Sequence, residues 1–158
     1  MSNVKSILFV CTGNSCRSVM AEALMRKFLK EFGKDYISVS SAGVSAINGL
    51  FPTQETVDVM KKEGLDVSGV RSKKITAEMI KNSDLILVME NSHKDIISKM
   101  APEAAAKTHL LKEFLIDKGS KNYPENTGVP DPIGEPTDFY RLSFEVIKDN
   151  IKRIARLI

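Results

Sequence analysis

A short loop near the start of the chain combines a cysteine with an arginine six positions later, a pair that could attack and hold a phosphoryl group. Its residues read Cys11-Thr12-Gly13-Asn14-Ser15-Cys16-Arg17-Ser18. An apolar run precedes the loop and an amphipathic stretch follows it. Backbone N–H groups at a helix start have no partner inside the helix and carry partial positive charge, so a tight loop leading into a helix is suited to bind phosphate. The sequence therefore predicts an anion-binding loop over residues 11–18.

Each residue type in the loop suits one part of phosphate chemistry. Cys11 would be the nucleophile toward phosphorus, because a nearby arginine and a helix start favour the thiolate. Arg17 offers a planar fork of donors that matches two phosphate oxygens. Gly13 and Asn14 tolerate the left-handed backbone that turns successive N–H groups inward. Ser18 is expected to donate its hydroxyl to the cysteine sulfur and to cap the helix.

Phosphoryl transfer to a thiolate also requires a proton for the leaving group, which another part of the chain must supply. Asp131, in a proline-rich loop over residues 129–134, is a candidate for this role. An Asp-Pro pair by itself usually marks a plain turn, so this prediction depends on the cysteine loop. Cys11 would take the phosphoryl group while Asp131 protonates the departing atom. Asp131 would then activate the water that hydrolyses the phosphocysteine, and no metal or other cofactor is required.

Apolar runs indicate the strands that would position this loop. Residues 7–10 and 85–89 are continuous apolar runs, which are typical of parallel strands buried on both faces. An alternating segment over residues 36–41 and a short segment over 108–111 predict two further strands. Ligands of open parallel sheets lie beyond the carboxyl ends of the strands, so the turn after residue 10 is the expected site.

Apolar residues at three- and four-residue spacing predict helices between these strands. This spacing is found over residues 20–28, over 57–60 and around 93–100. One face of the last helical segment is expected to carry Phe139, Leu142, Val146, Ile147, Ile151, Ile154 and Ile158. The alternation predicts an α/β fold of three layers, in which helices cover both faces of an open parallel sheet.

Length and charge limit the class of protein. The 158 residues suit a single domain over residues 1–158. The net charge of +3 comes from basic residues spread along the chain, so we expect no nucleic-acid partner. No window approaches the roughly 18 apolar residues of a membrane helix, and the first residues lack a secretory cleavage site. We therefore expect a cytoplasmic monomer with no membrane partner.

These motifs are similar to those of the low-molecular-weight protein tyrosine phosphatase family. The family signature begins with a strand that ends in Val-Cys and contains Gly-Asn and Cys-Arg-Ser, as residues 10–18 do. Other matching segments are Ser41-Ala42-Gly43, Asp84 with Met89, and Asp131-Pro132. The resemblance runs through most of the chain and implies four parallel strands with helices on both sides. It also implies that Ser41 helps to hold Asn14 and the loop in place.

The resemblance implies a phosphatase that acts on phosphotyrosine in phosphorylated proteins and releases inorganic phosphate. It also implies the same general acid, Asp131. In addition to Cys11, Arg17 and Asp131, the phosphate-binding loop would then comprise Thr12, Gly13, Asn14, Ser15, Cys16 and Ser18. The pocket rim would be formed by Ile47, Phe51 and Ile133. Cys16 would be a redox partner that bonds reversibly to Cys11, because a neighbouring thiol can rescue an oxidised thiolate as a disulfide.

Departures from the family pattern bear on the substrate. Ser15 stands where tyrosine-directed members commonly carry a bulky aliphatic residue, and Ile133 and Gly134 stand where they carry aromatic residues. Loss of aromatic walls weakens the binding of a flat aryl ring. A small polar residue at position 15 is closer to the phosphoarginine phosphatases of the same family. A protein arginine phosphatase is therefore the alternative prediction.

Three other functions are compatible with a cysteine in such a loop. Thioredoxin-coupled arsenate reductases have a similar loop but need further cysteines, whereas both cysteines of this chain lie in the loop. A phosphocysteine carrier of a sugar phosphotransferase system should preserve its phosphocysteine, which Arg17 and Asp131 argue against. A non-catalytic phosphate-binding module would not need all three residues. His93 and His109 are expected at surface or edge positions without a catalytic role.

Overall fold

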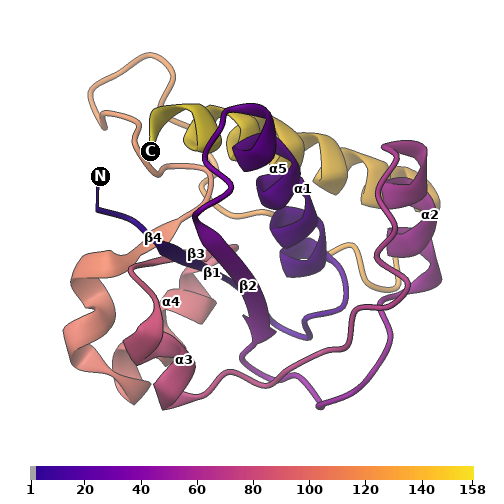
Figure 1. Cartoon of the computed structure of the whole chain (residues 1–158), viewed down its shortest axis with the longest axis horizontal. Helices are drawn as coiled ribbons and strands as arrows, with labels where there is room; N and C mark the ends of the chain where they lie inside the picture. Colours follow the sequence, from indigo (N-terminus) through magenta and orange to yellow (C-terminus); the bar gives the residue numbers. More distant parts are fainter. Residues whose placement is uncertain (1–2) are drawn as a thin grey trace.

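A four-stranded parallel sheet forms the centre of the computed structural model, which describes residues 3–158. In chain order the strands are β1 (Ser6–Cys11), β2 (Ser38–Gly43), β3 (Leu85–Val88) and β4 (Thr108–Leu110). Their order across the sheet is β2-β1-β3-β4, and each neighbouring pair is parallel (Figure 1). The predicted open parallel sheet is confirmed, and β1 lies at its centre.

Helices connect successive strands and close the chain. They are α1 (Arg17–Glu31), α2 (Gln54–Lys62), α3 (Ala77–Asn82), α4 (Asn91–Met100), the 3₁₀ helix η1 (Pro102–Lys107) and α5 (Thr137–Leu157). Neither α3 nor η1 was expected, because six residues are too few to show a clear helical period. The start of α3 is stabilised by the Thr76 hydroxyl, which accepts a hydrogen bond from Met79 N–H at 3.2 Å.

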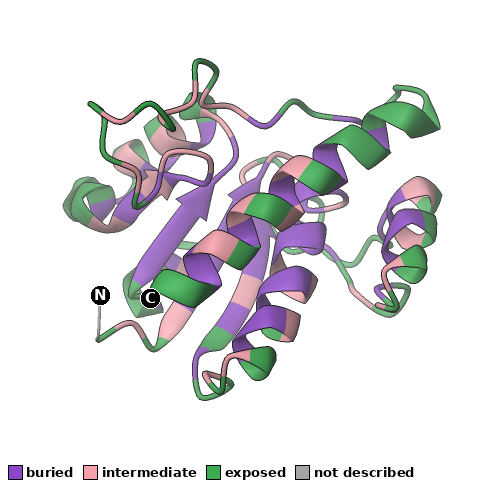
Figure 2. Cartoon of the chain, turned by 90° about the horizontal axis from the view of Figure 1, so that it is seen from above, coloured by how far each residue is buried: buried purple, intermediate pink, exposed green. Residues whose placement is uncertain are grey.

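Both faces of the sheet are covered, which explains the continuous apolar runs of its central strands. Ile7 and Phe9 of β1 pack on the face covered by α1 and α5, while Leu8 and Val10 pack on the face covered by α3 and α4 (Figure 1). Successive strand side chains point to opposite faces, so a strand buried on both sides must be apolar throughout. The inner sides of α1 and α5 are buried and their outer sides exposed (Figure 2).

The apolar face of α5 is rotated from the expected one at its start. Ile147, Ile151 and Ile154 are buried, as their spacing predicts. Leu142, in contrast, is 62% exposed, and the first turns bury Tyr140 and Phe144 instead. The expectation for the early part of this helix was therefore wrong, because α5 packs against α1 and also meets α2 near its start. None of the helices described over residues 3–158 has the length and apolar character needed to span a bilayer.

Candidate active site

The loop between β1 and α1 lies at the carboxyl edge of the sheet, where parallel α/β sheets bind ligands. Asn14 has a left-handed backbone with φ of 53°, whereas Gly13 does not, so only one of the two expected left-handed positions occurs. Gly43 at the end of β2 passes directly beneath the loop. A Cβ there would lie 2.5 Å from Thr12 O and 2.8 Å from Asn14 N, so this position needs glycine.

Cys11 is buried at the end of β1, and Ser18 holds its sulfur. Cys11 Sγ lies 2.9 Å from Ser18 Oγ, and Ser18 Oγ accepts a hydrogen bond from Asn14 Nδ2 at 2.8 Å. The serine proton is then available to the sulfur as a hydrogen-bond donor. Ser18 does not cap the helix as expected. Cys16 occupies the N-cap position and α1 begins at Arg17.

A chain of hydrogen bonds fixes Asn14, and with it the loop. Asn14 Oδ1 accepts the N–H of Lys73 at 2.9 Å, and Nδ2 donates to Ser41 Oγ at 3.0 Å. Ser41 Oγ in turn donates to Glu22 Oε1 at 2.7 Å. This network joins the loop to β2, to α1 and to the segment before α3. Ser41 lies where the predicted loop-supporting residue should be, while Glu22 and Lys73 had no sequence signal.

Arg17 is the largest fully buried side chain of the site, with 1% of its surface exposed. Its Nη1 donates to Glu90 Oε2 at 2.9 Å and to the carbonyl oxygen of Val129 at 2.7 Å. Its Nη2 donates to Thr12 Oγ1 at 3.3 Å. A buried guanidinium needs such partners because an unpaired buried charge is costly. These contacts leave the Nε–H edge of the guanidinium for an anion in the loop.

Asp131 reaches the site from the loop that precedes α5. Its Oδ2 lies 3.5 Å from Arg17 Nη2, and its Oδ1 accepts the N–H of Ile133 at 3.1 Å. The side chain is 39% exposed, so it faces the open side of the loop. A partly exposed carboxyl group in such a place can exchange a proton with a leaving group or with water.

Cys16 packs beneath the loop among hydroxyl groups. Its sulfur lies 3.4 Å from Thr53 Oγ1 and 3.9 Å from the Tyr140 hydroxyl oxygen. Burial, with a further contribution from Cys16, raises the pKa of Tyr140 to about 12, so this phenol stays protonated near neutral pH. Both cysteines are free in the structure. The disulfide with Cys11 stays a prediction, and the Thr53 and Tyr140 contacts were not anticipated.

His93 departs most from expectation. It was expected on the surface of a polar helix, but it is buried at the start of α4 and its Nε2 lies 2.9 Å from Thr12 Oγ1. Glu90, which the sequence reasoning also missed, immediately precedes α4 and pairs with Arg17. Its place just beyond β3 was the available signal, because residues that follow central parallel strands converge on the site. His109 stays partly buried against Phe114, at the sheet edge.

The predicted rim residues Ile47, Phe51 and Ile133 expose half or more of their surface. Thr53 N–H donates to Ser15 O at 3.2 Å, which brings the neighbouring Phe51 beside the loop. Phe51 is 65% exposed, and the guanidinium carbon of Arg71 lies 3.5 Å from the centre of its ring. Ile47 and Ile133 are also exposed. The rim therefore offers apolar surface together with a stacked cation.

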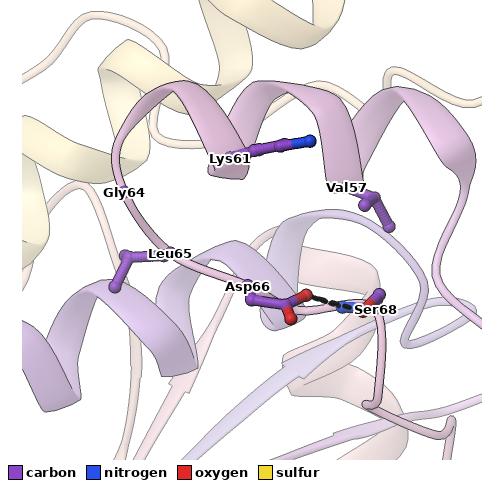
Figure 3. A pocket seen from close by; sticks show the side chains of 6 residues that line it. All are labelled: Val57, Lys61, Gly64, Leu65, Asp66 and Ser68. Carbon is purple, nitrogen blue, oxygen red and sulfur yellow. Dashed lines mark hydrogen bonds between the residues drawn. The ribbon is translucent and has the colours of Figure 1, made fainter.

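A separate surface hollow of about 490 Å³ lies between the end of α2 and the following loop (Figure 3). Its lining residues are Val57, Lys61, Gly64, Leu65, Asp66 and Ser68. Asp66 Oδ1 accepts hydrogen bonds from the N–H and the hydroxyl of Ser68, which lowers the pKa of Asp66. None of the predicted site residues lines this hollow. We therefore place the chemistry at the loop and not in this hollow.

Comparison with known proteins agrees with this geometry. Residues 6–158 match the family model described as low molecular weight phosphotyrosine protein phosphatase. The low molecular weight protein-tyrosine-phosphatase Etp of Escherichia coli is 37% identical over 96% of this chain and 90% of its own. A protein-arginine-phosphatase of Geobacillus stearothermophilus is 36% identical over 94% and 93%, respectively.

A solved structure is also similar throughout. The low molecular weight protein tyrosine phosphatase from T. tengcongensis superposes with a TM-score of 0.86 and 38% identity, covering 97% of this chain and 99% of that one. The family expectation is thus confirmed over nearly the whole length. The chain belongs to the low molecular weight phosphotyrosine protein phosphatase family, whose members are hydrolases with a cysteine nucleophile.

Proposed function

We propose that the chain dephosphorylates proteins at phosphotyrosine, with Cys11 as nucleophile, Arg17 as phosphate ligand and Asp131 as general acid and base. One observation carries the proposal. The loop brings a hydroxyl-bonded cysteine sulfur, a buried arginine and a carboxylate together from segments more than a hundred residues apart. A plain core cysteine would not need an arginine held by three acceptors beside it.

The reaction runs in two displacements. In the first, Cys11 Sγ forms a bond to phosphorus, the bond from phosphorus to the leaving oxygen breaks, and Asp131 gives that oxygen a proton. In the second, Asp131 takes a proton from water, the water oxygen bonds to phosphorus, and the bond from sulfur to phosphorus breaks. Inorganic phosphate leaves and the thiolate is restored. Loop N–H groups and Arg17 stabilise the equatorial oxygens in both steps.

The choice of phosphotyrosine is supported by the rim. Ile47 and Phe51 each lie two residues from a backbone N–H, of Ser45 and Thr53 respectively, that donates to a carbonyl oxygen of the loop. The N–H of Ile133 itself donates to Asp131. The three side chains offer apolar surface to the phenyl ring of a phosphotyrosine whose phosphate is bound in the loop. An aromatic contact with Phe51 adds roughly 0.5 to 1.5 kcal/mol beyond burial, provided that the ring keeps one face free of Arg71.

A second candidate, hydrolysis of phosphoarginine, is favoured by Ser15 and by the stacking of Arg71. Ser15 is small and half-buried, and its hydroxyl lies 3.7 Å from Cys16 Sγ. It leaves space and a hydrogen-bonding group where a bulky aliphatic side chain would supply neither. The face of Phe51 already accepts one guanidinium, so a substrate guanidinium could replace Arg71 there.

The other functions have less support. An arsenate reductase that relays a disulfide needs cysteines outside the loop, and the chain has only Cys11 and Cys16. A phosphocysteine carrier is disfavoured by Asp131, which would promote hydrolysis. A binding module without turnover would not require the acid next to Arg17.

Phosphate release from matched phosphotyrosine and phosphoarginine peptides tests the proposal, with Cys11→Ser as the blank. We expect the wild-type chain to release phosphate from the tyrosine peptide at least about 10³-fold faster than Cys11→Ser. A preference for the arginine peptide would select the second candidate. No release from either peptide, with phosphate binding intact, would favour the carrier or the binding module.

We also propose that residues 1–158 form one phosphatase domain that acts as a cytoplasmic monomer. The family match over residues 6–158 supports the single domain. Sedimentation equilibrium of the purified chain and fractionation of the cells that produce it naturally would test the monomer and the compartment.

A further inference from the structure

His93 is a buried titratable side chain that the proposed reaction does not use. It is the third residue of α4, and 1% of its surface is exposed. Both ring nitrogens have partners. The N–H of Glu90 donates to Nδ1 at 3.1 Å, and Nε2 lies 2.9 Å from Thr12 Oγ1. A histidine held in this way has a defined tautomer, because one nitrogen must accept while the other donates.

The direction of each bond follows from the backbone. Because Nδ1 accepts the Glu90 N–H, the proton of the neutral ring is on Nε2. Burial, assisted by the charge of Arg17 and opposed by Glu90 and Asp131, lowers the pKa of His93 to about 4. The ring is therefore neutral near pH 7, and its Nε2–H donates to Thr12.

Thr12 then accepts from two donors. Its Oγ1 receives His93 Nε2–H and Arg17 Nη2–H, the latter at 3.3 Å. A hydroxyl oxygen has two lone pairs and one proton. Because both lone pairs of Thr12 Oγ1 already accept hydrogen bonds, the hydroxyl can form a further hydrogen bond only as a donor. Thr12 is half-buried and belongs to the loop that is proposed to bind phosphate. Its free O–H is thus available to an anion held there.

We propose that His93 is a positioning residue that acts through Thr12. Its Nε2–H holds the threonine side chain so that the hydroxyl supports Arg17 and donates its own proton to an oxygen of bound phosphate. This role rests on the proposed function, since phosphate is the group that the phosphatase reaction binds and releases. A neutral donor suits this place because Glu90 and Asp131 already pair with Arg17, the one nearby cation among the described contacts.

Three substitutions separate positioning from a capping role at the start of α4. His93→Asn keeps an acceptor near Nδ1 for the Glu90 N–H but cannot reach Thr12. His93→Gln keeps a longer amide that can donate near the Nε2 position. Thr12→Val preserves the shape of the side chain and removes the hydroxyl. Binding of inorganic phosphate by calorimetry, kcat/KM on an aryl phosphate and the unfolding temperature are measured for each variant and for the double variant H93N/T12V.

We expect His93→Asn and Thr12→Val each to weaken phosphate binding and lower kcat/KM about tenfold, at an unfolding temperature close to that of His93→Gln. His93→Gln should stay within about threefold of wild type, and His93→Asn should add nothing to Thr12→Val. The role would be overturned if His93→Asn bound phosphate as tightly as the wild type does. It would also be overturned if His93→Asn weakened phosphate binding in the Thr12→Val background as much as it does in the wild type. Absence of turnover in the wild type, with this binding pattern intact, would instead remove the proposed function alone.

Discussion

The floor of the loop and its rim differ in how their side chains are held. Cys11, Asn14, Arg17 and Ser18 on the floor are buried, and each has a hydrogen-bond partner. The rim residues Ile47, Phe51 and Ile133 are mostly exposed. Removing a partner on the floor leaves a buried polar group unpaired, whereas a change on the rim costs the fold little. We therefore expect mutations to separate the phosphoryl-transfer step from the choice of substrate.

The sharpest test of the proposed chemistry is Asp131, which lies beside the floor at Arg17 and is 39% exposed. Asp131→Asn keeps the shape of the side chain and the acceptor for Ile133 N–H but loses the proton that the leaving group needs. We expect kcat on an alkyl or protein phosphoester to fall by about 10² to 10⁴. The loss should be smaller on an activated aryl phosphate, whose leaving group departs unprotonated. Equal losses on both substrates would assign Asp131 a purely structural role beside Arg17.

The buried floor should also make the fold sensitive to acid through His93. Its pKa is about 4 in the folded chain and near 6.5 when unfolded, so between these values the unfolded chain binds more protons. Stability is complete above about pH 6.5 and falls, by up to about 3 kcal/mol, as the pH decreases toward 4. Denaturant unfolding across this range checks the slope. His93→Gln should unfold with a flatter pH dependence, and an unchanged slope in that variant would contradict the assignment.

Replacing Ser41, which supports the loop through Asn14, should have a smaller effect on stability. Ser41→Ala removes the hydroxyl that accepts from Asn14 and donates to Glu22. We expect a loss of about 1 to 3 kcal/mol in unfolding free energy, because Asn14 Nδ2 and Glu22 Oε1 each lose one hydrogen-bond partner near the buried loop. Urea unfolding measures the loss. Ser38→Ala is a matched control on an exposed position of the same strand and should change stability by less than about 1 kcal/mol.

The smallest expected effect is on the rim, where it bears on substrate and not on chemistry. Phe51→Ala should lower kcat/KM for a phosphotyrosine peptide about two- to tenfold, because an aromatic contact contributes roughly 0.5 to 1.5 kcal/mol. Phosphate binding and the unfolding temperature should not change. A loss of phosphate binding in this variant would mean that rim and floor are coupled and that the separation between them does not hold.

Local pattern was sufficient where a feature depends on neighbours in the sequence. The runs over residues 7–10 and 85–89 are apolar because β1 and β3 are buried on both faces, so they could be recognised without a structure. The order of Cys11, Arg17 and the following helix likewise lies within one short segment. The boundaries of α3 and η1 could not be predicted in this way, since each is only six residues long.

Pattern failed where a contact joins distant segments. Nothing near His93 distinguishes it from a surface residue of a polar helix, because its hydrogen-bond partner Thr12 is 81 positions away. The partners of Arg17 at Glu90 and Val129 are similarly remote. The stacking of Arg71 on Phe51 also depends on how two loops meet.

The sequence by itself determined the parallel sheet and pointed to the loop after its first strand, with Cys11 as the proposed nucleophile, because strand burial and the loop chemistry are encoded in short stretches of residue types. The tertiary structure alone decided how Arg17 is held, how far Asp131 lies from it and that His93 is part of the floor. The physical reason is that hydrogen bonds and ion pairs between remote segments form only once the sheet has assembled, because the carboxyl ends of its parallel strands then lie at one edge.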